Sequence, residues 1–259
     1  MLTIDIGNSR IKWAQFAGDD IKAHGAFGYE YSDVENALDK AGLPHVSEAV
    51  QISCVAGVEL KERIKKWLSA NDFKEYRFAE TRANQCGVTN SYEIVANLGV
   101  DRWLAMIAAY KLSETKSDFV TCVIDCGTAV TLDFVDAKGE HMGGLIMPGY
   151  STMVNSLVRD TGNIGDFSGM NEVITHIKKI RSEIAVSTHD AVVNGCVQLM
   201  IAGISGIVSK SMKDSEGKMN CLVTGGDGEW VSDALECANT YNPFLVLQGL
   251  KIVSGKEQS

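Results

Sequence analysis

Short apolar runs separated by polar turns open the chain, and the same arrangement returns about 120 residues later. Residues 2–6 and 11–16 form one pair of runs, and residues 122–126 and 130–135 form the other. Runs of this length that contain many β-branched residues are typical of strands. A turn rich in Asp or Gly follows each pair, and after it we expect a third strand. The pattern predicts a duplication in which both halves begin with an antiparallel hairpin.

The segments after each hairpin alternate between strand and helix patterns. Residues 31–41, 60–71 and 101–112 have the apolar spacing of helices, whereas residues 50–55 read as a strand. In the second half, residues 188–211 are long, apolar and mostly helical, although three glycines interrupt them. Mixed strand and helix in both halves indicates an α/β protein.

A polar stretch at residues 113–118 precedes the second hairpin and is the expected boundary between the halves. It divides the chain into residues 1–115 and residues 116–259. A chain of 259 residues is long enough for two small domains that each bury a core.

Charge and cysteine usage exclude several classes of protein. The net charge is −9, whereas extended nucleic-acid binding needs a basic surface, so we expect no nucleic-acid partner. We expect no membrane partner, because we find no apolar run of ~18 residues and residues 1–7 read as a strand rather than a signal peptide. The seven cysteines lack CxxC or Cys/His spacing and fit thiols in a reducing compartment. The chain is therefore expected to be soluble and cytoplasmic.

Each hairpin bends at an Asp-x-Gly sequence, first at Asp5-Ile6-Gly7-Asn8 and then at Asp125-Cys126-Gly127-Thr128. Glycine allows a phosphate to approach the backbone closely, and the N–H groups of such a turn can bind an anion. The short polar side chains of Asn8, Ser9 and Thr128 can hydrogen-bond phosphate oxygens, and the aspartates can hold a cation that bridges to them. The alternative is that both sequences merely mark hairpin turns. Two copies with matching flanks favour the hypothesis that both turns bind the phosphates of ATP.

Other nucleotide-binding motifs are missing from the sequence. It contains no GxxxxGK[ST] P-loop and no GxGxxG dinucleotide-binding turn. Two further glycine-containing loops do occur, at residues 143–149 and at residues 224–227. The second follows an apolar strand, where a flat ring could lie against the backbone, or it is an ordinary turn between a strand and a helix.

Leu98-Gly99-Val100-Asp101-Arg102-Trp103 begins a predicted helix and carries charges in the first turn. One interpretation of Asp101 is a helix cap, because the N-terminus of a helix favours acidic side chains. The other is a general base that accepts the proton of an alcohol, beside an arginine that binds phosphate or carboxylate.

Together these motifs resemble the type III pantothenate kinases over nearly the whole chain. The resemblance is carried by residues 5–9, 99–102, 125–129, 143–149 and 224–226. It implies the actin/Hsp70/sugar-kinase fold, in which two ribonuclease-H-like halves enclose ATP in a cleft between them. It also implies phosphorylation of pantothenate to 4'-phosphopantothenate, the first step of coenzyme A biosynthesis.

The resemblance assigns individual roles to residues of this chain. Asp101 is the expected proton acceptor, and Asp125 the expected ligand of a monovalent cation, K⁺ or NH₄⁺, beside the Mg²⁺ carried by ATP. The residues expected to bind ATP are Asp5, Ile6, Gly7, Asn8, Ser9, Arg10, Ile11, Lys12, Thr128, Gly225 and Gly226. Those expected to bind pantothenate are Tyr92, Gly99, Val100, Asp101, Arg102 and Thr188.

A homodimer is expected on two grounds. First, the apolar stretch 192–208 presents more apolar surface than one small half-domain is expected to bury. Second, the resemblance places pantothenate at a subunit interface, where Thr188 of the partner chain reaches it. The alternative is a central helix of a monomer.

One departure from the family and two alternative functions remain. Ile94-Val95 stands where the family often has Asn-Pro, which puts the role of Tyr92 in doubt. The chain could instead be a kinase of the same fold for another small alcohol or acid, or a non-catalytic nucleotide-sensing regulator. Such a regulator is expected to lack a catalytic aspartate, yet Asp5, Asp101 and Asp125 are all present.

Overall fold

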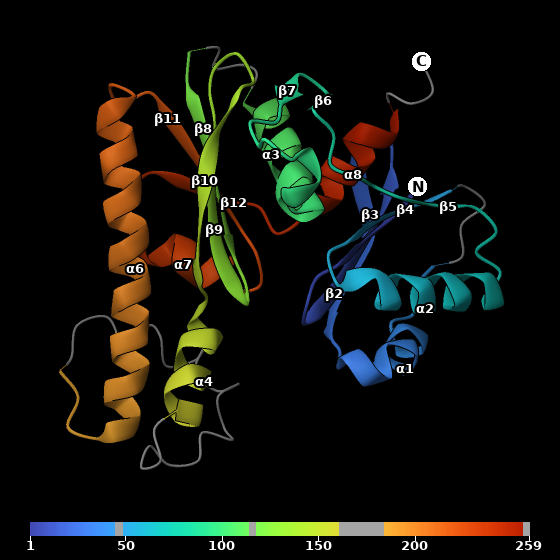
Figure 1. The fold of residues 1–259 in the computed structure, drawn as a ribbon, viewed down its shortest axis with the longest axis horizontal. Helices are drawn as coiled ribbons and strands as arrows, with labels where there is room; N and C mark the ends of the chain where they lie inside the picture. Colours follow the sequence, from blue (N-terminus) through green and yellow to red (C-terminus); the bar gives the residue numbers. More distant parts are fainter. Residues whose placement is uncertain (45–48, 114–117, 161–183, 256–259) are drawn as a thin grey trace. The chain divides into compact units, whose positions relative to one another are not determined.

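A computed structural model describes residues 1–44, 49–113, 118–160 and 184–255. Contacts divide the chain into two units (Figure 1). Unit 1 comprises Met1–Ser117, Val135–Gly143 and Phe244–Ser259, and unit 2 comprises Asp118–Phe134 and Gly144–Pro243. The division at residue 115 stays a prediction, and the contacts add two later segments to the first unit.

Unit 1 is built on a sheet with the strand order β3-β2-β1-β4-β5. These strands are β1 Leu2–Ile6, β2 Arg10–Ala17, β3 Asp20–Gly28, β4 Val50–Cys54 and β5 Tyr76–Phe78. β1 to β3 form an antiparallel meander, whereas β1, β4 and β5 pair in parallel. Every residue of the central strand β1 is buried, as expected for a strand covered on both faces.

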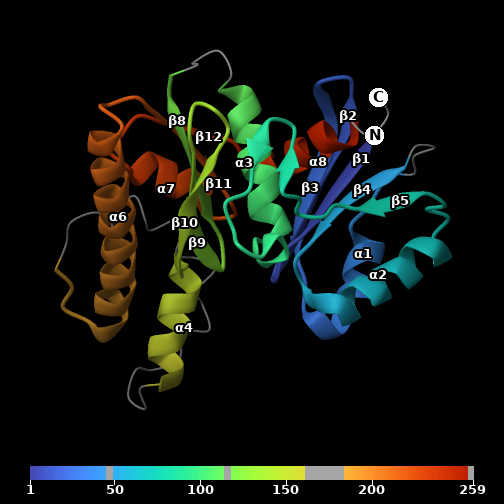
Figure 2. The ribbon, with the colours of Figure 1, turned by 45° about the horizontal axis from the view of Figure 1, so that its top comes forward.

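Helices cover both faces of the unit 1 sheet (Figure 2). They are α1 Val34–Lys40 after a 3₁₀ turn at Tyr31–Asp33, α2 Gly57–Ala70, α3 Val100–Leu112 and α8 Leu245–Gly255. Leu2, Ile4 and Ile6 of β1 join the core formed with α1 and α2. α3 and α8 pack closely, because a Cβ on Gly249 would collide with the carbonyl oxygen of Leu104.

Unit 2 repeats the same sheet order as β10-β9-β8-β11-β12. The strands are β8 Val120–Cys126, β9 Ala129–Val135, β10 His141–Pro148, β11 Met219–Thr224 and β12 Asn239–Tyr241. β8, β11 and β12 pair in parallel, as β1, β4 and β5 do in unit 1. The repeat of one sheet order confirms the predicted duplication, including a third strand in each half.

The helices of unit 2 are α4 Tyr150–Asp160, α6 Thr188–Asp214 and α7 Gly228–Ala234. Their apolar residues form one core with the side chains of Cys122, Ile124 and Cys126 from β8. Figure 1 shows α6 and α7 on the same side of this sheet. The rest of unit 2 between α4 and α6 lies mostly outside the described residues.

Helix α6 differs from two expectations drawn from the sequence. It runs unbroken for 27 residues through Gly195, Gly203 and Gly206, because burial of residues such as Val197, Met200 and Ile204 stabilises it. By length and composition alone it could also cross a membrane, since an 18-residue window has a mean hydropathy of 1.8 and is 39% buried. The expectation that no apolar stretch reaches this length was wrong.

Candidate active site

The two Asp-x-Gly turns occupy equivalent positions in the two sheets. Asp5 lies near the end of β1 and pairs across the sheet with Ser53 of the parallel strand β4. Asp125 lies near the end of β8 and pairs with Thr224 of the parallel strand β11. Both aspartates therefore stand next to a buried hydroxyl residue at the carboxyl edge of a parallel pair, where α/β proteins bind ligands.

The first turn is held by hydrogen bonds to its backbone. Gly7 N–H donates to the carbonyl of Arg10 (3.0 Å), and the Tyr29 hydroxyl donates to the carbonyl of Gly7 (2.6 Å). Burial, helped by nearby Cys54, Tyr31 and Asp5, raises the pKa of Tyr29 to about 12, so the phenol stays protonated and can donate. Asn8 and Ser9 at the tip are exposed.

Two other glycines of unit 2 approach the second turn closely, Gly149 directly after β10 and Gly225 directly after β11. A Cβ on Gly149 would collide with the carbonyl oxygen of Gly127, and a Cβ on Gly225 with that of Cys126. Gly149 N–H and the Thr152 hydroxyl both donate to the carbonyl of Thr128, at 3.0 and 2.5 Å. Gly149 and Gly225 thus shape the backbone of residues 126–128, whereas residues 143–148, expected to be a loop, belong to strand β10.

Gly7 and Gly127 themselves have no positive φ, so the turns do not need glycine for their backbone angles. The benefit of glycine here is the missing side chain, which leaves the N–H groups open to an anion. Among the described residues no group of three or more His, Cys, Asp or Glu could hold a metal ion.

Asp101 lies in the first turn of α3, where Gly99 takes the cap position. Its carboxylate accepts a hydrogen bond from the Arg102 N–H at 2.8 Å. A Cβ on Gly99 would lie 2.7 Å from the same carboxylate, so a larger residue here would displace the Asp101 side chain. Asp101 thus satisfies one N–H group at the start of α3, as a helix cap would, although it lies inside the helix rather than at the cap position. Its side chain is only partly buried.

Tyr92 comes to Arg102 from a different segment of unit 1. The Arg102 side chain is buried and its Nη1 donates to the Tyr92 hydroxyl at 3.1 Å, while the guanidinium lies 5.8 Å from the centre of the ring. Such an arrangement adds a cation–π interaction to the hydrogen bond. The change to Ile94-Val95 leaves a 3₁₀ turn at Val95–Asn97 and does not separate Tyr92 from Arg102.

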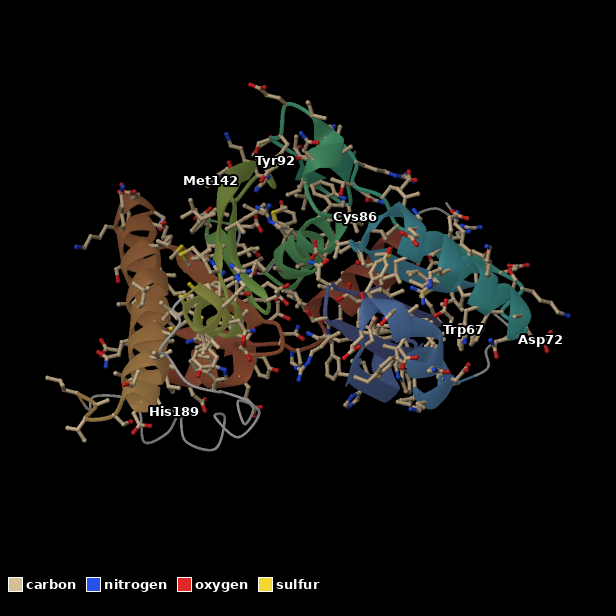
Figure 3. The ribbon with its side chains drawn as sticks, turned by 60° about the horizontal axis from the view of Figure 1, so that its bottom comes forward. Trp67, Asp72, Cys86, Tyr92, Met142 and His189 are labelled. Carbon is tan, nitrogen blue, oxygen red and sulfur yellow. The ribbon has the colours of Figure 1, made fainter. Side chains whose placement is uncertain are left out.

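His141 belongs to the same cluster. It is 3% exposed, stacks on Tyr92 with ring centres 5.8 Å apart, and its Nδ1 lies 3.2 Å from Ser91 Oγ. Figure 3 shows Tyr92 near Met142, the residue that follows His141. Its position two residues before the paired glycines Gly143-Gly144 is the signal in the sequence that could have indicated it.

Thr188 begins α6 in unit 2 and is exposed, as is its neighbour His189 (Figure 3). Ser187 caps the helix by accepting a hydrogen bond from the Asp190 N–H at 3.1 Å. The Thr188 hydroxyl is therefore not needed as the cap of the helix and stands at its N-terminal end, which favours negatively charged groups.

The fold is that of the actin/Hsp70/sugar-kinase class. Three solved structures of low sequence identity share it. A chain described as a Baf family transcriptional activator from Campylobacter jejuni is 19% identical and has a TM-score of 0.60, with 100% of this chain and 99% of that chain covered. The ethanolamine utilization protein EutJ from Carboxydothermus hydrogenoformans has a TM-score of 0.52 at 14% identity, covering 97% and 89%. MreB 5 of Spiroplasma citri, bound to AMPPNP, has 0.53 at 10% identity, covering 99% and 96%.

The family follows from the sequence comparison. A family profile described as type III pantothenate kinase matches residues 1–210, and the chain belongs to this family. A type III pantothenate kinase of Nitrosococcus oceani is 32% identical, with 98% of this chain and 93% of the relative covered. Another from Dechloromonas aromatica is 34% identical, with 97% of each chain covered. The resemblance drawn from the motifs is confirmed.

Proposed function

We propose that this protein transfers the γ-phosphate of ATP to the primary alcohol of pantothenate, giving 4'-phosphopantothenate at the start of coenzyme A biosynthesis. The observation that carries the proposal is the cluster of Asp101, Arg102 and Tyr92 at the start of α3, in a chain of the type III pantothenate kinase family. The experiment that tests it is the release of ADP from ATP in the presence of pantothenate.

ATP is proposed to bind through the two equivalent turns. Backbone N–H groups and the polar side chains of residues 5–12 and of Thr128 would contact the phosphates, and the glycines at Gly225-Gly226 would face the adenosine. Asp5 would hold the Mg²⁺ that ATP carries, directly or through water. The cation would neutralise charge that develops on the transferred phosphoryl group.

Pantothenate is proposed to bind at the start of α3. It carries a carboxylate and a primary hydroxyl, and Arg102 is suited to bind the carboxylate through its planar guanidinium. The Asp101 carboxylate would accept the proton of the hydroxyl as the oxygen attacks phosphorus. Gly99, Val100 and Tyr92 would line the same site, and Thr188 would complete it from a partner chain.

Asp125 is proposed to bind a monovalent cation, K⁺ or NH₄⁺. It is partly buried at the end of β8, and burial together with the charges of Asp125 and Asp227 raises the pKa of the Cys126 thiol between them. Concentrated negative charge beside three phosphates favours an additional cation.

The proposed cation site predicts an activity that depends on the salt. We expect faster turnover in potassium or ammonium buffer than in sodium or Tris, and a smaller difference in Asp125→Asn. The measurement is the initial rate at matched ionic strength and saturating Mg²⁺–ATP. Equal rates of the unaltered protein in all four media would contradict the proposal.

A homodimer is proposed on the outer surface of α6. Ala191, Gly195, Ala202 and Gly206 are partly or fully exposed on α6 at helical spacing, and Leu199 among them is 66% exposed. Small side chains allow two helices to pack closely, and an exposed apolar stripe favours a protein partner. The same surface would bring Thr188 into the assembly.

Light scattering at micromolar concentration should give twice the 28.0 kDa of the chain. Ala202→Arg should reduce the particle to 28.0 kDa, because a charged side chain would stand in the contact. Glu229→Arg, at an exposed position on α7, is the control and should stay dimeric. A particle of 28.0 kDa without any substitution would remove the proposal.

A cytoplasmic location is proposed because all seven cysteines are free thiols. The lack of nucleic-acid and membrane partners stays a prediction. The shared fold of the Baf family chain does not support the alternative of a regulatory relative, because a likeness at 19% identity shows the fold alone. The retained aspartates Asp5, Asp101 and Asp125 favour an enzyme.

A further inference from the structure

His141 is an aromatic residue buried against the proposed pantothenate site, yet no step of the proposed reaction uses it. Its ring is nearly parallel to that of Tyr92, with an angle of 16° and 5.8 Å between ring centres. Tyr92 in turn receives the hydrogen bond from Arg102. The three residues form a row in which His141 contacts the face of Tyr92 and Tyr92 contacts Arg102.

The segment that carries His141 is anchored to the segment that carries Tyr92. The hairpin β6 Asn84–Gln85 and β7 Val88–Thr89 precedes Tyr92. Thr89 N–H donates to the carbonyl of Gly139 at 2.9 Å, and Gly139 has φ +88° and approaches Gly87 too closely for any side chain. This contact brings together two segments that lie about 50 residues apart in the sequence. It thereby fixes the position of His141 beside the ring of Tyr92.

Tyr92 itself lies in a loop and needs such support. Its backbone N–H donates to the Asn90 side chain at 2.9 Å, and its side chain is half-buried. Ser91 before it and Ile94 after it are exposed, with Ile94 at 62%. The aromatic ring of Tyr92 can therefore leave Arg102 by rotation about its side-chain bonds unless another group holds its face.

We infer that His141 is a positioning residue for pantothenate binding, which stacks on Tyr92 and holds the phenol against Arg102. The inference rests on the proposed role of Tyr92 and Arg102 in the substrate site. The ring of His141 matters more than its charge, and Ser91 fixes the orientation of that ring. Loss of the ring weakens pantothenate binding and leaves ATP binding unchanged, because the phosphate-binding turns do not include this segment.

The test compares His141→Leu, which fills the space without a flat ring, with His141→Phe, which keeps the ring. Aromatic pairs contribute enough beyond simple burial for His141→Leu to raise the KM of pantothenate about two- to tenfold. His141→Phe should stay within about twofold of the unaltered protein, and the KM of ATP should not change in either. His24→Ala is the control, because His24 also contacts an aromatic ring of unit 1, that of Phe244, at 4.8 Å between ring centres.

A double-substitution cycle separates positioning from general packing. In a Tyr92→Ala background, His141→Leu should raise the KM of pantothenate no further. An equal rise in both backgrounds, or His141→Phe behaving as His141→Leu does, would overturn the inference.

If Tyr92→Ala alone leaves the KM of pantothenate unchanged, the proposed substrate site fails at Tyr92 and the inference fails with it. If Tyr92→Ala raises it and His141→Leu does not, the inference alone fails. Should His141→Leu not fold, His141→Gln takes its place with the same outcomes.

Discussion

Asp101→Asn is expected to lower kcat by about 10²–10⁴-fold while the affinity for ATP stays nearly unchanged. Asparagine keeps the shape of the side chain and can still accept the hydrogen bond from the Arg102 N–H, so the start of α3 should be preserved. It cannot accept the proton of an alcohol. Because phosphoryl transfer through a loose transition state depends little on a base, we expect an effect toward the lower end of this range.

Asp5→Asn is the control for this prediction. Asp5 and Asp125 stand at equivalent positions of the two sheets, which suits a shared task in binding cation and phosphate, whereas Asp101 has no counterpart among the described residues of unit 2. Asp5→Asn should therefore weaken the binding of Mg²⁺–ATP, measured by calorimetry. A near-normal kcat in Asp101→Asn would mean that Asp101 only stabilises the helix end. Loss of ATP binding in Asp101→Asn but not in Asp5→Asn would show that the two roles are reversed.

Gly225→Ala is expected to destabilise the protein by about 3 kcal/mol and to weaken ATP binding at least about tenfold. Gly225 has φ +100°, which is unfavourable for alanine, and the added methyl group would collide with the carbonyl of Cys126. Relief of that collision must move the turn at Asp125–Thr128. The measurements are the free energy of unfolding in urea and nucleotide affinity by calorimetry.

Gly217→Ala separates the effect of the positive φ from the effect of the collision. Gly217 also lies in unit 2 and has φ +79°, but no atom lies within 4 Å of an added Cβ. It should cost only about 1 kcal/mol and leave ATP affinity unchanged. If Gly225→Ala proves no worse than Gly217→Ala, the packing of Gly225 against the turn does not matter for nucleotide binding.

The duplication was predictable because it depends on local patterns. The apolar runs at residues 2–6 and 122–126, each ending in Asp-x-Gly, give the same hairpin wherever they occur. The start of α3 was predictable for the same reason, since Gly99 and Asp101 lie in one short motif.

Helix α8 was not predicted because its short apolar run Leu245-Val246-Leu247 fits a buried strand as well as a helix. Leu250 and Val253 share the buried face with this run, whereas Gln248 and Lys251 lie outside it. Contacts with α3 and with the strands β1 and β4 of unit 1 explain why this face is apolar.

The contact of His141 with Tyr92 could not be predicted either. The two residues lie on segments that belong to different halves of the sequence, and tertiary packing alone joins residues 135–143 to unit 1. Local propensity contains no information about such a contact, whereas it does specify the two turns that are proposed to bind ATP.

The release of ADP across a panel of acceptors tests the central proposal most directly. The panel contains pantothenate, pantetheine, sugars and acetate, each with Mg²⁺–ATP in potassium buffer. We predict one ADP released per pantothenate consumed, little release with sugars or acetate, and loss of the pantothenate-dependent signal in Asp101→Asn. No release with pantothenate, or equal release with a sugar or acetate, would contradict the proposed function.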